Sequence, residues 1–270
     1  MPKNLRITLM QQPLVWENPQ ANLIHFTNLI NKIKTGSSDV IVLPEMFTTG
    51  FTMKATHLAE TKGGLAMSWM AEVAKEKKMA ICGSVMMKEG RNIYNQFVWM
   101  SPDMTYSTYN KRHLFRMGKE HEVFAAGDES VLIAYKGWNI CPLVCYDLRF
   151  PVWSRNRLPK ADAKTNSPVY DILLYVANWP EVRRFAWKQL LIARAIENQC
   201  YVVGVNRVGI DGNGMKHKGD SVVLNYLGTK ISKIPTSRPS VETVVLDAAS
   251  LTKYRKSFPA LMDADQFIIR

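Results

Sequence analysis

The sequence predicts an α/β protein, because short apolar runs alternate with amphipathic stretches of helical spacing. The first helical stretch opens on a start signal, Asn18 followed by Pro19. The second strand is a β-branched run that Pro44 stops. The expected order is strand, helix, strand, helix, strand, at residues 5–10, 18–34, 40–43, 63–78 and 79–87.

The rest of the chain continues this alternation after a hairpin around Ser101-Pro102-Asp103. We expect strands at 93–100, 105–109, 140–144, 172–176, 201–206, 222–224 and 242–246. We also expect a helix-like segment at 151–156 and a helix at 183–199. Residues from about 250 lack a clear pattern and are expected to form a C-terminal tail.

Length and composition favour one globular domain, which we place at residues 1–270. The chain exceeds the usual single-domain length, but α/β folds of this size are common around one core. A content of 47% hydrophobic and 21% charged residues excludes a disordered or collagen-like chain. No repeat or linker divides the sequence.

The sequence predicts a cytoplasmic protein without a membrane segment or a metal site. No stretch approaches the roughly 18 apolar residues of a membrane helix, and the N-terminus lacks a signal-peptide pattern. The cysteines are too few for a disulfide scaffold and are expected to be reduced thiols. Cys141 and Cys145 lack the C-x-x-C spacing of a zinc site and have no histidine nearby.

The net charge of +12 raises the question of a nucleic-acid or membrane partner. Basic residues are spread along the chain and interleaved with acids, as in Lys75-Glu76-Lys77-Lys78. A solvated basic surface is therefore the favoured interpretation, and we expect neither partner. A basic nucleic-acid-binding module is kept as the alternative from another functional class.

Three chemically different residues follow expected strands: Glu45, Lys111 and Cys145. Ligands of α/β sheets gather beyond the carboxyl ends of strands, so these positions are candidates for a reactive site. Together the three supply a base, a cation and a nucleophile. Singly, each is more commonly a helix cap, a surface charge or a small core residue. The segment after Cys145 turns the chain sharply, which predicts an exposed thiol at a bend with backbone N–H groups nearby.

Three segments of the sequence resemble the signature segments of the nitrilase superfamily, in that family's order and spacing. The segments are Leu43-Pro44-Glu45-Met46-Phe47, Asn110-Lys111-Arg112-His113-Leu114-Phe115 and Cys145-Tyr146-Asp147-Leu148-Arg149-Phe150-Pro151. The resemblance continues through Ala-Asn-Trp-Pro at 177–180 and Gly-Asp-Ser at 219–221. Phrases such as Lys-Arg-His-Leu-Phe-Arg-Met look most like the omega-amidase branch, whose members hydrolyse the terminal amide of α-keto acid amides.

The resemblance implies a four-layer α-β-β-α sandwich that dimerises through a helix face. It implies Glu45 as general base, Lys111 as stabiliser of the tetrahedral intermediate and Cys145 as nucleophile, with no cofactor. A further glutamate usually lies between the lysine and cysteine segments. Glu120 is preferred for this role, although Glu122 is close enough to compete.

An acidic substrate needs a cationic contact, ideally an arginine fork. Arg116 and Arg149 lie nearest the signature residues, although either could instead pair with Asp147 or Glu120. The cavity walls are expected from Phe47, Phe115 and Trp179, and the backbone N–H of Tyr146 is expected to bind the oxyanion.

The same three catalytic residues could serve other reactions, namely hydrolysis of nitriles or of N-carbamoyl amines. A catalytically idle scaffold is a third possibility. The intact set of Glu45, Lys111 and Cys145 argues against it, since an unused site should have lost at least one member.

Overall fold

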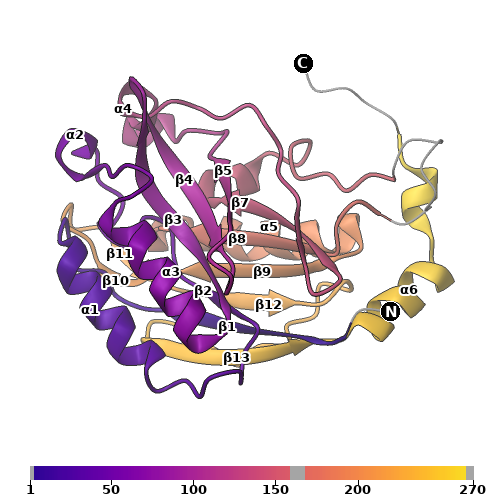
Figure 1. The fold of residues 1–270 in the computed structure, drawn as a ribbon. Coiled ribbons are helices and arrows are strands. Elements are labelled where there is room, and N and C mark those ends of the chain that lie inside the picture. Colours follow the sequence, from indigo (N-terminus) through magenta and orange to yellow (C-terminus); the bar gives the residue numbers. More distant parts are fainter. Residues whose placement is uncertain (1–2, 159–167, 266–270) are drawn as a thin grey trace.

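Two β-sheets form the centre of the computed structural model, which describes residues 3–158 and 168–265 (Figure 1). The six-stranded sheet has the order β13-β1-β2-β3-β4-β5, and the five-stranded sheet has the order β12-β9-β8-β7-β6. A separate ribbon pairs β10 with β11. The strands are β1 Leu5–Gln11, β2 Val40–Val42, β3 Ala80–Glu89, β4 Asn92–Met100, β5 Tyr106–Asn110, β6 Ile133–Tyr135, β7 Trp138–Val144, β8 Ile172–Ala177, β9 Tyr201–Asn206, β10 Val208–Ile210, β11 Lys216–Lys218, β12 Val222–Leu224 and β13 Ser240–Leu246.

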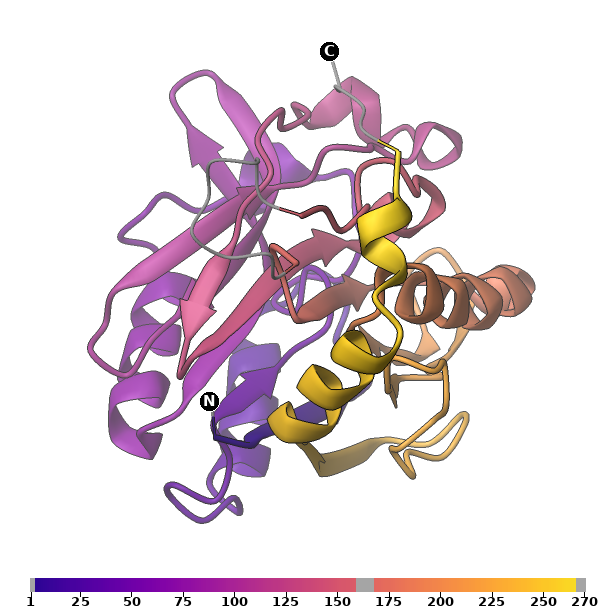
Figure 2. The ribbon, with the colours of Figure 1, turned by 90° about the vertical axis from the view of Figure 1, so that its right-hand side faces the viewer.

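Helices cover the outer faces of both sheets, as Figure 2 shows with the sheets in the middle. Helices α1 (Pro19–Ile30) and α3 (Leu65–Lys77) pack on the six-stranded sheet, with Phe26 and Met70 in one cluster with Ile81. Helix α5 (Arg184–Asn198) packs on the other sheet. The predicted four-layer α-β-β-α sandwich is therefore confirmed.

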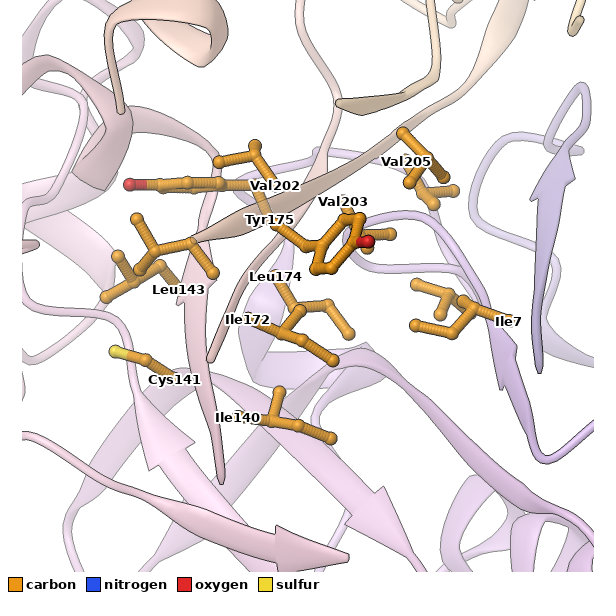
Figure 3. Close-up of a cluster of buried hydrophobic side chains, with 14 of the residues drawn as sticks. Ile7, Ile140, Cys141, Leu143, Ile172, Leu174, Tyr175, Val202, Val203 and Val205 are labelled. Carbon is orange, nitrogen blue, oxygen red and sulfur yellow. The ribbon is translucent and has the colours of Figure 1, made fainter. Parts of the chain in front are cut away.

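Alternate side chains of each strand point into the space between the two sheets and fill it. In β1, Leu5, Ile7 and Leu9 belong to the inter-sheet core, and in β2 Val40 and Val42 do the same while Ile41 faces the helices. Figure 3 shows Ile7 in one cluster with side chains of β7, β8 and β9 from the other sheet.

The longer predicted strands and helices are all present, with ends shifted by a few residues. The helix-like segment expected at 151–156 is wrong, because these residues form turns and a 3-10 turn at Cys145–Arg149 precedes them. The short elements α2 (Ala55–Leu58), α4 (Glu120–Val123), β6 and the β10–β11 ribbon have too little periodicity to be predicted.

The expected C-terminal tail contains helix α6 (Ala248–Ser257). The Asp247 side chain caps this helix by accepting hydrogen bonds from the N–H groups of Ala249 and Ser250. Leu251 is buried, and Tyr254 stacks on the Tyr226 ring at 4.5 Å, so α6 packs against the body of the protein. Few of its residues are apolar, which is why the sequence pattern is weak. Among the described residues, no helix combines the length and the apolar character needed to cross a membrane.

Candidate active site

The structure brings Glu45, Lys111 and Cys145 together at a cavity of about 580 Å³. Each residue lies beyond the carboxyl end of a strand, after β2, β5 and β7 respectively. The first two come from the six-stranded sheet and Cys145 from the five-stranded sheet, so the site lies where the two sheets meet.

Cys145 is held in a left-handed backbone conformation, with φ of 46°. A non-glycine residue in this region is strained by about 1–3 kcal/mol, and such strain gathers at functional sites. Asp147 fixes the turn, because its Oδ2 accepts the Val144 N–H at 3.0 Å and the Tyr109 hydroxyl at 2.8 Å. The thiol does lie at the predicted bend, but it is nearly buried rather than exposed, facing the cavity.

Lys111 bridges two buried carboxylates. Its Nζ lies 2.9 Å from Oε1 of Glu45 and 2.9 Å from each carboxylate oxygen of Glu120. All three side chains are almost without solvent exposure. Glu120 is the glutamate at this position, whereas Glu122 is exposed on α4.

Burial and the surrounding charges set the protonation of this cluster. Burial opposes the charge of Lys111, but the carboxylates of Glu120 and Glu45 outweigh it and raise the pKa of the ammonium. Burial raises the pKa of Glu120, and the charge of Lys111 only partly offsets this. The groups that hydrogen-bond Glu120 are nevertheless all donors, from Lys111, Asn95 and the Phe115 N–H, which is the arrangement of an ionised carboxylate.

The resting form of Cys145 is the neutral thiol. Burial raises its pKa well above the usual value, and the negative charge of Glu45 raises it further. The positive charge of Lys111 acts in the opposite direction but does not compensate. Proton loss from Cys145 therefore has to accompany its attack on a substrate.

Two asparagines with no role predicted from the sequence position the glutamates. Asn95 on β4 donates from Nδ2 to Oε1 of Glu45 at 2.8 Å and to Oε1 of Glu120 at 3.1 Å. Asn178, directly after β8, donates its backbone N–H to Oε2 of Glu45 at 2.8 Å and its Nδ2 to the Glu45 carbonyl. The only sequence signal for Asn178 is its place at a strand end within the Ala-Asn-Trp-Pro phrase.

Four of the six expected substrate-contacting residues line the cavity: Phe115, Tyr146, Arg149 and Trp179. Phe47 does not, because its ring is fully buried against Phe26 and Trp69 on the helix side of the sheet. Arg116 does not either, since it is exposed on a 3-10 turn outside the cavity. Both predictions were wrong. Among the residues that the structure describes, no arginine pairs with Asp147, whose Oδ1 instead lies 2.8 Å from Nδ1 of His113.

Several cavity residues were not predicted, among them Trp16, Phe51, Arg183 and His217. His217 is buried on β11, and its Nδ1 lies 3.0 Å from the Met215 carbonyl, a bond in which only the nitrogen can donate. Burial lowers the pKa of His217 to about 4, and the nearby Arg207 charge acts in the same direction. His217 is therefore an uncharged wall of the cavity at neutral pH.

Arg207 supports this wall from behind. It is fully buried, and its Nη2 donates to the carbonyls of Leu14 and Ile210 at 3.3 and 3.2 Å. These carbonyls belong to the segments that carry Trp16 and the β10–β11 ribbon. Arg207 thus joins two parts of the cavity wall that are far apart in the sequence.

A thiol, a carboxylate and an ammonium at one cavity of an α-β-β-α sandwich define a hydrolase of the nitrilase superfamily, as the sequence resemblance implies. Within the described residues, no group of three or more His, Cys, Asp or Glu side chains is arranged to hold a metal ion. The chain belongs to the carbon-nitrogen hydrolase family, whose family model matches residues 6–256.

Named relatives cover nearly the whole chain. Omega-amidase YafV of Escherichia coli K12 is 48% identical over 97% of this chain and 98% of its own length. The 2-oxoglutaramate amidase of Bacillus subtilis is 31% identical over 95% of this chain and 96% of its own. A CN-hydrolase superfamily protein of Xanthomonas campestris, solved with an arsenic adduct in its active site, is 42% identical with a TM-score of 0.95, covering 99% of both chains.

Proposed function

We propose that this protein is an omega-amidase. It hydrolyses the terminal amide of small dicarboxylic acid monoamides, such as 2-oxoglutaramate or 2-oxosuccinamate, to the acid and ammonia. The observation that carries the proposal is the buried cluster of Glu45, Lys111 and Glu120 beside the Cys145 thiol, at the cavity. The names of its relatives, omega-amidase and 2-oxoglutaramate amidase, support the choice of substrate.

In the first half-reaction, Sγ of Cys145 attacks the amide carbon while Glu45 accepts the thiol proton. The negative charge that develops on the carbonyl oxygen is stabilised by Lys111 and the backbone N–H of Tyr146. The carbon–nitrogen bond then breaks, and Glu45 transfers its proton to the leaving nitrogen. Ammonia departs and the acyl group stays on Cys145 as a thioester.

In the second half-reaction, water replaces ammonia. Glu45 accepts a proton from the water, whose oxygen attacks the thioester carbon. The carbon–sulfur bond breaks and the proton returns from Glu45 to Sγ, which restores the resting thiol. Glu120 keeps Lys111 in place through both steps, because its two oxygens both accept hydrogen bonds from the ammonium.

The proposed assembly is a homodimer that buries the exposed face of α5. Phe185 and Ile196 are exposed apolar residues about three helical turns apart, and Val182 precedes the helix. Sedimentation of a Phe185→Glu variant tests this proposal, which predicts a monomer where the native protein forms a dimer. The proposed location is the cytoplasm, which agrees with four free thiols.

A panel assay for ammonia release tests the function. The panel contains glutaric acid monoamide, an aliphatic nitrile and an N-carbamoyl amine at equal concentrations. We expect the monoamide to have the highest kcat/KM. A preference for the nitrile or the carbamoyl amine would assign the same residues to that reaction. Salt-dependent retention of nucleic acid without ammonia release would refute the proposal that the protein is an enzyme.

A further inference from the structure

Arg149 and Arg183 combine a place at the cavity with guanidinium groups that no acidic side chain of the described residues neutralises. Both line the cavity, and within residues 3–158 and 168–265 neither forms an ion pair. The only hydrogen bond of either guanidinium in this part of the chain runs from Arg183 to Sδ of Met117, a weak acceptor. Four other arginines, at 6, 184, 194 and 255, do form ion pairs with acidic side chains.

Aromatic rings hold the two guanidinium groups. The Arg149 guanidinium lies 5.1 Å from the centre of the Trp179 ring, and that of Arg183 lies 5.3 Å from the centre of Phe115. The indole N–H of Trp179 donates to the Arg183 carbonyl at 2.8 Å, which ties the two arginines together. Phe115 in turn packs against Tyr146 at 5.1 Å, next to the nucleophile. The stacking orients both cations and leaves most of their N–H donors free.

The other charged groups of the cavity do not neutralise this pair. Lys54 and Glu17 form their own ion pair at 3.0 Å, and Glu45 is bound to Lys111. The Asp211 carboxylate accepts the N–H groups of Asn213 and Met215. The wall formed by Arg149 and Arg183 therefore carries two positive charges with donors available to an anion.

We propose that Arg149 and Arg183 together bind the free carboxylate of the substrate and determine the preference for acidic amides. This inference rests on the proposed amidase function and adds Arg183, which lies outside the signature segments. A guanidinium pair binds a carboxylate through several charge-assisted hydrogen bonds. It also disfavours an ammonium group beside that carboxylate, so an α-amino acid amide such as glutamine is a poorer substrate than the acid monoamide without the amino group.

The test compares glutaric acid monoamide with pentanamide, which has the same chain length and no carboxylate. The variants are Arg149→Gln and Arg183→Gln, with Arg116→Gln as the matched control outside the cavity. We expect KM for the monoamide to rise about 10- to 100-fold in either variant, with kcat little changed. The kcat/KM for pentanamide is expected to stay near the native value, and inhibition by glutarate is expected to weaken in parallel.

Other outcomes would exclude either the role of the two arginines or the amidase function. If Arg183→Gln lowers kcat/KM equally for both amides, or keeps the native ratio of the two values, Arg183 does not bind the substrate carboxylate. If the native enzyme hydrolyses both amides with equal kcat/KM, the arginine pair does not determine a preference for acidic amides, although the amidase function still holds. No ammonia from either amide refutes the proposed function itself.

Discussion

Asn178 donates its backbone N–H to Oε2 of Glu45 at 2.8 Å, across the junction between the two sheets. Its Nδ2 also donates to the carbonyl of Glu45, so one residue fixes both ends of the proposed base. The position of Glu45 on the first sheet thus depends on a strand end of the second. The native packing of the two sheets is therefore a condition for catalysis.

This contact predicts the effect of Asn178→Ala. The variant keeps the backbone donor but leaves the buried Glu45 carbonyl without its partner, which costs about 1–3 kcal/mol of unfolding free energy. We expect kcat to fall about tenfold or more because the base is less well oriented. Steady-state kinetics and urea unfolding measure the two effects. Asn92→Ala, at the exposed start of β4, is the control and should change neither.

Replacement of Lys111, which bridges the two carboxylates, should reduce stability much more than Asn178→Ala does. Lys111→Met leaves the Glu45 and Glu120 carboxylates buried together without a counter-ion, and breaking such a cluster costs about 3–5 kcal/mol. Chemical denaturation should therefore show a large loss of stability, together with the loss of turnover. Lys77→Met provides the control, because Lys77 is also buried, and within the described part of the chain its ammonium donates hydrogen bonds to the carbonyls of Asn31 and Ile33 and to no acidic side chain. Equal stability losses in the two variants would contradict the special role of the cluster.

The buried His217 predicts a pH dependence of stability. Its pKa is lowered from 6.5 to about 4 in the folded protein, so between these values the unfolded chain binds more protons. This residue therefore contributes a loss of stability as the pH falls from about 6.5 to about 4, and no further change below. Urea unfolding of the native protein and of His217→Gln across this range should differ in slope. Identical slopes would mean that His217 titrates normally.

Because Phe47 lies in the core and Phe115 lies at the cavity, replacing each by alanine should have a different effect. Phe47→Ala should cost about 3–5 kcal/mol of stability, because the ring fills the core between β-sheet and helices. Phe115→Ala, at the cavity, should raise KM with a smaller loss of stability. Thermal unfolding and KM for the monoamide measure the difference. The reverse pattern would restore Phe47 as a substrate contact.

The sequence predicted the features that follow from periodicity and from the order of motifs. The strand ends before Glu45 and Cys145 were predicted from apolar runs and the one before Lys111 from the hairpin pattern, and the superfamily resemblance implied the layers. What could not be read were contacts between segments distant in the chain. Phe47 and Glu45 lie two positions apart, a spacing that would place both side chains on one face if the strand continued. Strand β2 ends at Val42, however, and residues 45–49 form a turn that directs Glu45 to the site and Phe47 to the core on the helix side.

Contacts between distant segments also explain why Arg116 was wrongly predicted at the site and Arg183 was not predicted there. Arg116 was chosen because it is near the signature segments in sequence, yet a 3-10 turn places it in solvent. Arg183 is distant from Cys145 along the chain, but it reaches the cavity because β8 runs parallel to β7 and ends beside it. Proximity in sequence is a poor guide to the membership of a site built from several strand ends.

The central claim is that turnover passes through a thioester on Cys145. The most direct test is mass spectrometry of the native protein and of Glu45→Gln, acid-quenched during incubation with glutaric acid monoamide, followed by peptide mapping. We expect an acyl group on Cys145 of the native protein. We expect much less of it in Glu45→Gln, which lacks the base that accepts the thiol proton, and neither adduct nor ammonia in Cys145→Ala, which should remain folded. An adduct mapped to Cys82, Cys141 or Cys200, or undiminished ammonia release by Cys145→Ala, would contradict it.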